Sequence, residues 1–541
     1  MFRRYNISRL AAVVLQNRDN LFGSDEKPEG SIYSYSLLKD IDKAVARIKY
    51  ALINNEHISI YGDYDADGVT ATAILYMYLT EQGASVDCYI PDRVEQGYGL
   101  HNTALESLKQ NGTNLVITVD TGVTANEQIE YAKILGLDVI ITDHHECKRT
   151  IPDCVAVINP KRVDCPYPFK ELAGVGVVLK LLEALQDGRD FEQLAQKYIG
   201  LVCIGTVADV VPLVDENRAL VSLGLKNIAQ RNNIGINALL EATNLIQKQI
   251  TAGHIGFIIA PRINAAGRLA NANKSLELFL CDDQKKALAI ALQLSQENRN
   301  RQQIEEEIFQ QAVEIVEQNE LYKNSVIVVA HKNWHSGVIG IVSSKITEKY
   351  HRPSILISID GQKAKGSGRS ISGFDLFRAL DHSKNHLLQF GGHSLAAGLS
   401  LETDSIKPFE RDINEYADTI LDAESFVPVM LIDAAINNSD LSIDNISGLS
   451  LLEPYGMGNP QPIFSFENAQ ALYINTLSEG KHLKIIAKRD GLKLEAIGFG
   501  MGNLVENINC GDNISIAGNL NINEYFGKKN VQLFIKDIKI I

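Results

Sequence analysis

The chain has 541 residues, of which 45% are hydrophobic and 22% are charged. This length exceeds what one hydrophobic core supports, and the composition has neither a disordered nor a fibrous bias, so a folded protein of about three or four domains is expected. The net charge of −14 excludes a uniformly basic surface that coats nucleic acid, whereas a local basic patch is compatible with it.

Cysteine usage and hydropathy bear on the compartment. The seven cysteines include no CxxC pair, which is typical of a reducing compartment rather than of a disulfide framework. Cys147, Cys154 and Cys165 follow two histidines, but their spacing fits no common zinc pattern, and ordinary thiols are the favoured interpretation. Since no apolar run reaches the roughly 18 residues of a membrane span and the start lacks the pattern of a secretory signal, we expect a cytoplasmic protein.

The first predicted unit after an N-terminal segment, residues 1–50, is a parallel α/β sheet within residues 51–280. Short apolar runs at 57–61, 115–119 and 138–142 each end at an acidic or imidazole side chain. Because ligand sites form outside the carboxyl ends of parallel strands, these three ends are expected to converge on one site.

An acidic turn follows the first of these runs. Asp63, Asp65 and Asp67 all belong to the six-residue string DYDADG. The mutual repulsion of their carboxylates favours a bound divalent cation. An EF-hand calcium loop would need a longer ligand series and a distal Glu, which this segment lacks. The remaining alternative is a solvated acidic loop.

Further candidate metal ligands follow the other apolar runs. An isolated Asp at the position of Asp120 would be interpreted as a helix cap. His144 and His145, however, follow Asp143 at the end of another strand, and Asp209 ends a further apolar stretch. Carboxylates beside imidazoles suit manganese or a similar divalent metal. With the acidic turn these ligands suffice for two cations, which implies hydrolysis of a phosphoester.

A two-metal site of this kind also needs groups that hold the phosphate, preferably arginines because of their bidentate geometry. An isolated arginine is more often part of a surface ion pair, so each candidate is weak alone. The predicted phosphate-binding or DNA-binding residues are Arg93, Arg262, Asn264, Arg268, Ser367, Arg369 and His393.

The remainder of the chain predicts three more parts. Residues 281–322 include a long stretch without Pro or Gly, with apolar residues at helical spacing, and predict a connecting helix. A second α/β unit is predicted at 323–410. Short β-like runs separated by glycine and polar turns predict a small barrel at 425–541. Within it, residues 471–541 carry nine Lys and Arg against seven Asp and Glu, so this end is slightly basic.

Eight strings, in chain order, closely resemble the RecJ branch of the DHH phosphoesterase superfamily: DYDADG, VDTG, DHH, GTVADVVPL, PRINAAGR, WHSGVIGIV, SGRS and GGHSLAAG. The resemblance covers residues 50–541 and implies a DHH catalytic domain, a DHH-associated domain and an oligonucleotide-binding (OB) barrel. It implies an exonuclease that degrades single-stranded DNA from the 5′ end to mononucleotides with two Mn²⁺ or Mg²⁺ ions, in recombination and repair. Expected partners are single-stranded DNA, a single-strand-binding protein and a RecQ-type helicase, and we expect a monomer.

The resemblance also implies residue roles. The metal ligands are Asp65, Asp67, Asp120, His144 and Asp209, with Asp63 as a further one. His145 and Arg268 would stabilise developing negative charge, and Arg268, Ser367, Arg369 and Arg93 would hold a phosphate. Tyr61 stands where many superfamily members have a His, so a histidine metal ligand is not expected at this position. Candidate DNA contacts of the barrel are Lys484, Lys488, Arg489, Tyr525, Phe526, Lys528 and Lys529.

Two other functions are compatible with parts of this pattern. One is a DHH-family phosphodiesterase for short or cyclic oligonucleotides or for pyrophosphate, against which the C-terminal barrel argues. The other is a non-catalytic nucleic-acid-binding protein, against which the intact set of metal ligands argues.

Overall fold

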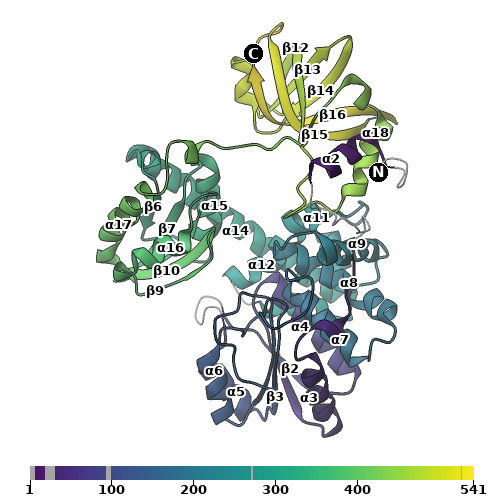
Figure 1. Cartoon of the computed structure of the whole chain (residues 1–541), viewed down its shortest axis with the longest axis vertical. Helices are drawn as coiled ribbons and strands as arrows, with labels where there is room; N and C mark the ends of the chain where they lie inside the picture. Colours follow the sequence, from purple (N-terminus) through teal and green to yellow (C-terminus); the bar gives the residue numbers. More distant parts are fainter. Residues whose placement is uncertain (1–6, 19–30, 93–98, 270–271, 526) are drawn as a thin grey trace.

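The molecule consists of a catalytic lobe, a second α/β lobe and a β-barrel, each built around its own sheet (Figure 1). The structure is a computed structural model that describes residues 7–18, 31–92, 99–269, 272–525 and 527–541. The barrel lies above the catalytic lobe in this view, and the second lobe lies to the left of both.

The catalytic lobe contains a five-stranded sheet in the order β2-β1-β3-β4-β5, with every neighbouring pair parallel. The strands are β1 (His57–Tyr61), β2 (Ser85–Tyr89), β3 (Leu115–Val119), β4 (Asp138–Thr142) and β5 (Ala156–Ile158). The three apolar runs therefore form the three central strands, as predicted, and their carboxyl ends share one edge of the sheet.

Helices cover both faces of this sheet, and further helices pack beside them to complete the lobe. They are α3 (Ile41–Ile53), α4 (Ala66–Glu81), α5 (Asn102–Gln110), α6 (Asn126–Ile134), α7 (Gly174–Leu185), α8 (Phe191–Ala208), α9 (Asp215–Ala229), α10 (Ile234–Ala242), α11 (Ala252–His254), the π-helix η2 (Ile255–Ile259), α12 (Ala260–Leu269) and α13 (Asn273–Leu280). Helix α4 is apolar nearly all round because it is enclosed by the sheet, α7 and α8.

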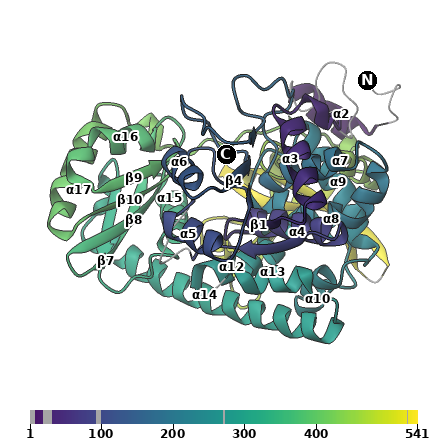
Figure 2. The same cartoon turned by 90° about the horizontal axis from the view of Figure 1, so that it is seen from below.

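One long helix, α14 (Gln284–Gln318), joins the two lobes, as predicted for residues 281–322 (Figure 2). Its 35 residues span about 50 Å at the usual rise per residue. The helix packs on α10 and α12 in the catalytic lobe and on α15 (Ile339–Tyr350) in the second lobe. None of the described helices is long and apolar enough to cross a membrane.

The second lobe contains a mixed sheet in the order β6-β7-β8-β10-β9. Its other elements are β6 (Ile327–His331), β7 (Ser354–Asp360), β8 (Lys363–Arg369), β9 (Gln389–Gly392), β10 (Ala396–Glu402), α16 (Leu376–His382) and α17 (Ile406–Asp418). Helix α17 runs past the predicted end of this unit at residue 410, because Ile413 and Ala417 are buried in the core of the lobe.

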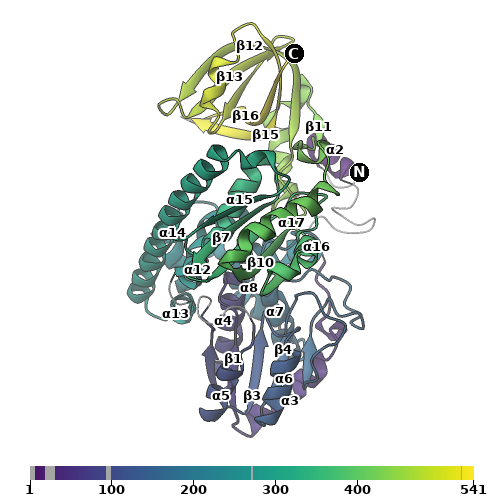
Figure 3. The ribbon, with the colours of Figure 1, turned by 90° about the vertical axis from the view of Figure 1, so that its left-hand side faces the viewer.

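The C-terminal body is a closed barrel, since β12 pairs with both β13 and β15 (Figure 3). Its strands are β12 (Phe464–Leu477), β13 (His482–Arg489), β14 (Leu492–Gly498), β15 (Asn513–Tyr525) and β16 (Lys528–Ile540), with β11 (Ala434–Ala435) at one edge and α18 (Ile443–Ser447) beside it. The N-terminal helix α2 (Arg9–Asn17) packs into the same core through Leu10 and Val14. The predicted segment 1–50 is thus divided, because α3 packs on the catalytic lobe instead.

Candidate metal centre and phosphate site

The acidic turn links β1 to α4 and is fixed by helix capping. Asp65 is the N-cap of α4, and its Oδ1 accepts hydrogen bonds from the backbone N–H groups of Asp67 (2.9 Å) and Gly68 (3.0 Å). A Cβ atom at Gly68 would lie 2.6 Å from the carbonyl oxygen of Asp63, so only glycine permits this tight turn.

Asp67 is held by a second helix that lies far away in the sequence. Its carboxylate accepts hydrogen bonds from the backbone N–H groups of Gly174 (2.6 Å) and Val175 (2.9 Å) in the first turn of α7. Helix α8 approaches from the other side, where a Cβ at Gly205 would lie 2.9 Å from Asp67 Oδ1. The carboxylate therefore sits at a helix N-terminus, which favours negative charge.

Asp120 follows β3 in the left-handed region, with φ 61°. Its backbone N–H donates to Thr142 O at the end of β4, which keeps the residue at the edge of the sheet. Gly174 is again the neighbour, because a Cβ there would lie 2.8 Å from Asp120 Oδ1. Positive φ is uncommon for a residue with a side chain, and Asp is one of the residue types that adopt it most readily.

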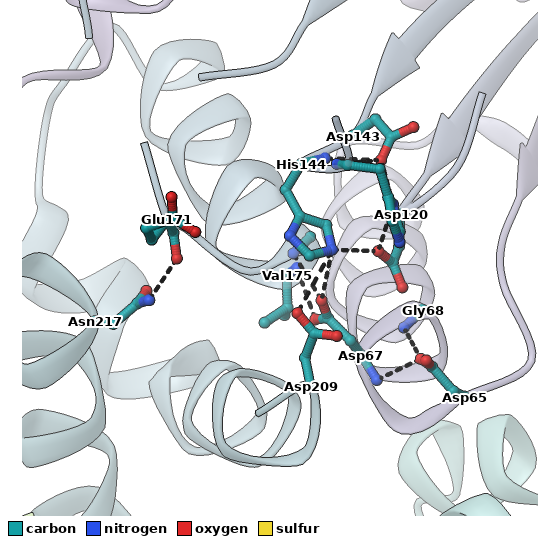
Figure 4. A network of polar contacts seen from close by, with 12 residues as sticks. Asp65, Asp67, Gly68, Asp120, Asp143, His144, Glu171, Val175, Asp209 and Asn217 are labelled. Carbon is teal, nitrogen blue, oxygen red and sulfur yellow. Dashed lines mark hydrogen bonds and ion pairs between the residues drawn. The ribbon is translucent and has the colours of Figure 1, made fainter. Parts of the chain in front are cut away.

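His144 lies at the centre of three carboxylates (Figure 4). Its Nε2 atom is 3.0 Å from Asp120 Oδ1, 3.5 Å from Asp209 Oδ2 and 3.9 Å from Asp67 Oδ2. Asp209 is the C-cap of α8, so these side chains come from the ends of β3, β4 and α8 and from the start of α4. The structure thus brings together the predicted ligands.

These side chains form groups with the spacing of metal ligands. Asp67, His144 and Asp209 make one such group, and Asp63, Asp65 and Asp120 make a second that shares no residue with the first. A third group, Asp120 with His144 and His145, connects the two. The arrangement provides separate ligand sets for two neighbouring cations with Asp120 between them.

The protonation of the metal-free ligands reflects their crowding. Burial, together with the charge of Asp65, raises the pKa of Asp67 to about 7. Burial and the charge of Asp67 raise the pKa values of both Asp120 and Asp209 well above the ordinary range. Burial lowers the pKa of His144 to about 3, so its imidazole is neutral. Neutral imidazole and carboxylate are the forms that bind a metal.

The donor set fits a pair of divalent cations. Oδ2 of Asp209 and Nε2 of His144 are buried without a hydrogen-bond partner among the described residues, although they face other ligand atoms. Buried polar atoms are normally satisfied, so these two are suited to bind a cation. Oxygen-rich sites with an imidazole suit Mn²⁺, and carboxylate oxygens also suit Mg²⁺.

Asp143 supports the centre from behind. Its Oδ1 accepts hydrogen bonds from His145 Nδ1 (2.8 Å) and from the backbone N–H of His144 (2.7 Å), and its Oδ2 accepts one from Val123 N–H (2.8 Å). Although burial opposes both shifts, this pairing lowers the pKa of Asp143 to about 2 and raises the pKa of His145. His145 is therefore poised to carry a proton beside the metal ligands.

The predicted phosphate residues on α12 have different surroundings. Arg268 reaches the second lobe, where its guanidinium donates to Gly337 O (3.0 Å). Arg262 donates to Ile258 O (2.5 Å) and to Ser295 Oγ (3.2 Å), which ties α12 to α14. The side-chain oxygen of Asn264 accepts a hydrogen bond from the backbone N–H of Ala66 (2.7 Å) in the acidic turn, a structural contact that the sequence did not indicate.

The other predicted phosphate residues gather in the second lobe. Ser367 and Arg369 lie on β8, with Arg369 Nη1 3.4 Å from Ser367 Oγ. The N-terminus of α15 faces them, because a Cβ at Gly340 would lie 2.8 Å from Ser367 Oγ and 3.5 Å from Arg369 Nη2. Arginine, hydroxyl and helix N-terminus together favour an anion. His393 is exposed on the turn between β9 and β10.

Arg93, Phe526 and the side chain of Tyr525 lie outside the described residues. Tyr61 is fully buried beside Tyr89, and its hydroxyl donates to Gly99 O (3.1 Å). Among the described residues no group with metal-ligand spacing includes a cysteine, and Cys147 and Cys154 pack against an apolar core instead.

Three family models match successive parts of the chain: the DHH family N-terminal domain at residues 57–206, the DHHA1 domain at 323–419 and the RecJ OB domain at 432–537. The single-stranded-DNA-specific exonuclease RecJ of Dickeya dadantii is 36% identical, over 95% of this chain and 92% of its own length. The Bacillus subtilis exonuclease of the same name is 41% identical over 95% of this chain, which spans 65% of that relative.

A solved structure shows the same architecture. RecJ from Thermus thermophilus in complex with Mn²⁺ superposes with a TM-score of 0.86 at 30% identity, and the match covers 99% of this chain and 77% of that one.

Proposed function

Because this chain belongs to the RecJ family of DHH phosphoesterases, we propose that it is an exonuclease that hydrolyses single-stranded DNA to mononucleotides with two Mn²⁺ or Mg²⁺ ions. The observation that carries the proposal is the pair of separate ligand groups at one sheet edge, joined by Asp120. The relatives are named single-stranded-DNA-specific exonucleases, and this supports the choice of substrate.

The residues divide the chemistry between them. Asp67, His144 and Asp209 would hold one ion, and Asp63, Asp65 and Asp120 the other. When bound, two such ions activate water and neutralise charge on the attacking and leaving oxygens. Although burial opposes it, the hydrogen bond to Asp143 raises the pKa of His145, and a protonated His145 would stabilise negative charge on the phosphate or supply a proton to the leaving oxygen.

The phosphate at the strand end would be held by the second lobe. Ser367, Arg369 and the N-terminus of α15 form the anion-binding group there, and Arg268 reaches across from the catalytic lobe to Gly337. A terminal phosphate held at one lobe places the next phosphodiester towards the other, which supports release of one nucleotide per cycle. We propose that this group binds a 5′ phosphate, with Arg93 as a further contributor, and that the polarity is 5′ to 3′.

The barrel offers a surface suited to single-stranded DNA. Phe499 is 60% exposed and forms edge-to-face contacts with His482 and Phe534, whose strands β13 and β16 flank β14. Lys484 follows on β13. Aromatic rings beside lysines bind bases and phosphates without sequence preference, and this sheet face is the usual ligand face of OB barrels.

The barrel residues predicted from the sequence do not all remain free for DNA. Arg489 donates to Ile436 O (2.6 Å) and Glu467 O (3.0 Å) and lies over the Phe466 ring, so its role is structural. Lys484 pairs with Glu495 at 2.8 Å, whereas Lys488 and Lys528 are exposed. The aromatic group around Phe499 is therefore the stronger candidate surface.

End-labelled strands test the assignment. With Mn²⁺, a strand carrying a labelled 5′ phosphate should release labelled mononucleotide at once, and the same strand labelled at its 3′ end should first shorten to a ladder. Asp120→Asn should abolish both products because it removes a carboxylate ligand of the second group that also lies beside His144 of the first. Release of the 3′ label first would reverse the polarity, and cleavage of dinucleotides alone would favour the short-oligonucleotide alternative.

The cellular setting follows from the same proposal. We infer a cytoplasmic enzyme of DNA recombination and repair that acts as a monomer alongside a single-strand-binding protein and a RecQ-type helicase. A pull-down with each partner, using Asp120→Asn protein to protect the DNA, tests both contacts.

A further inference from the structure

Arg218 on α9 is a buried arginine that binds a neighbouring domain. Its side chain is 2% exposed, and its guanidinium donates to three consecutive backbone carbonyls, those of Leu451 (2.9 Å), Leu452 (2.9 Å) and Glu453 (2.7 Å). This segment belongs to the C-terminal body and lies between α18 and β12. A buried charge is costly unless it is satisfied, so this planar fork with three acceptors fixes the segment strongly.

The same segment is bound a second time, from the barrel side. The side-chain nitrogen of Asn459 donates to Leu452 O (2.7 Å) and Pro454 O (2.9 Å), so the carbonyl of Leu452 is shared by Arg218 and Asn459. Asn459 is 1% exposed. Arg218 and Asn459 therefore hold the carbonyl of Leu452 from two sides.

Arg18, at the end of the N-terminal helix α2, completes the chain of contacts. Its guanidinium donates to Asn459 Oδ1 (3.4 Å) and Pro460 O (2.7 Å) and forms a bidentate pair with Asp433. Asp433 also accepts a hydrogen bond from the backbone N–H of Ile463 (2.9 Å), one residue before β12. A continuous set of hydrogen bonds therefore runs from the catalytic lobe to the first barrel strand.

We call the hydrogen bonds of Arg218, Asn459 and Arg18 the clamp. The clamp begins next to the metal centre. The loop that leads from Asp209 to α9 donates a hydrogen bond from Leu213 N–H to Met457 O (2.7 Å), and a Cβ at Gly456 would lie 2.6 Å from Leu213 Cδ1. Asp209 is thus separated by only a short loop from the surface on which the barrel is seated.

We propose that Arg218 and Arg18 are positioning residues that fix the barrel relative to the metal centre, so that a strand bound at the barrel is delivered to the nuclease site. The inference rests on the proposed function. It adds a structural reason why the enzyme would cleave long strands better than short ones. A barrel held at a fixed place raises the effective concentration of its bound strand at the metals, and a loosely attached barrel loses this advantage.

Comparing cleavage of long and short strands distinguishes a positioning role of Arg218 from a general contribution to the stability of the protein. A strand of about 30 nucleotides can occupy barrel and metal centre together, whereas one of about six nucleotides cannot, given the usual site size of an OB barrel. Arg218→Lys keeps the charge but cannot reach three carbonyls with a planar fork. It should raise KM for the long strand about tenfold, leave kcat unchanged, and leave both constants for the short strand unchanged.

Arg18→Ala is the second variant, because it breaks the outer part of the clamp and leaves the three hydrogen bonds of Arg218 in place. It should give the same pattern with a smaller change in KM. Arg189→Ala is the matched control, since that side chain is 81% exposed and pairs only weakly with Asp187. Circular dichroism and small-angle scattering of each variant report whether the barrel stays folded and whether its distance to the catalytic lobe spreads.

The outcomes are distinct. Loss of the long-strand advantage in both clamp variants, with short-strand cleavage intact, supports the proposal. If both variants are folded and keep the wild-type KM for the long strand, or if both strand lengths are affected equally, the clamp has no positioning role. Failure of the wild type to degrade either strand would instead contradict the proposed function itself.

Discussion

Replacing Asp67 by asparagine is expected to make the metal-free catalytic lobe progressively more stable than the wild type as the pH rises. In the folded protein burial and Asp65 raise the pKa of Asp67 from an ordinary 3.8 to about 7. The folded wild type therefore keeps a proton that the unfolded chain has released. Its stability falls as the pH rises from about 4 to about 7, whereas asparagine does not titrate.

The magnitude follows from linkage. A difference of roughly three pKa units at about 1.4 kcal/mol each gives up to about 4 kcal/mol across this interval. Asparagine also presents an amide to the N–H groups of Gly174 and Val175, but that cost does not depend on pH. His144, whose pKa burial lowers to about 3, contributes a pH dependence of opposite sign in both proteins, and it cancels in the difference.

Hydrogen exchange of peptides from β1 and β3, corrected for intrinsic exchange at each pH, measures the free energy of opening of this lobe. In EDTA, the free energy of opening of Asp67→Asn minus that of the wild type should grow as the pH rises. With saturating Mn²⁺ it should reverse, because only the wild type gains the full binding energy of the metal. A difference that stays constant with pH in EDTA, or that is the same with Mn²⁺, would refute the electrostatic account of the site.

Three further substitutions test individual contacts. Gly174→Ala places a Cβ against Asp120 and should weaken Mn²⁺ binding at least about tenfold by calorimetry, whereas Gly176→Ala on the same helix should not; equal binding would contradict the assigned packing. Asn264→Ala leaves a backbone N–H of the acidic turn unpaired and should cost about 1–3 kcal/mol in urea unfolding, with Asn264→Asp retaining the acceptor. Arg369→Lys should raise KM about tenfold for a 5′-phosphorylated strand but not for a 5′-hydroxyl strand; an equal effect on both would remove Arg369 from the phosphate site.

Sequence reasoning predicted which candidate ligands lie together because of a regularity of parallel sheets. The central strands are buried along most of their length and mostly apolar, so the first charged or imidazole side chain after each run marks the strand end, and the strand ends share one edge. Asp120 and His144 could be placed together for this reason although 24 residues separate them. The DHH-type motifs added the residue roles.

The supporting contacts could not be predicted in the same way. Gly174 and Gly205 touch the ligands through helix packing, which depends on how α7 and α8 are seated on the sheet rather than on any local pattern. Asn264 lies between two arginines in PRINAAGR, and this context suggested a phosphate contact, whereas its side chain caps the acidic turn. Helix α2 has an apolar stripe, but such a stripe does not specify its partner, because hydrophobic burial is not directional.

Helix N-termini explain how the fold keeps its acidic ligands together before a metal binds. Asp65 caps α4, and Asp67 accepts two hydrogen bonds from the first turn of α7, so both carboxylates lie where the helix dipole favours negative charge. The start of α15 faces Ser367 and Arg369 in the opposite lobe. The same backbone feature thus occurs twice, once at the candidate metal ligands and once at the proposed phosphate site. It follows that sequence changes in the first turn of α7 should alter metal affinity, whereas those in the first turn of α15 should alter affinity for the DNA end.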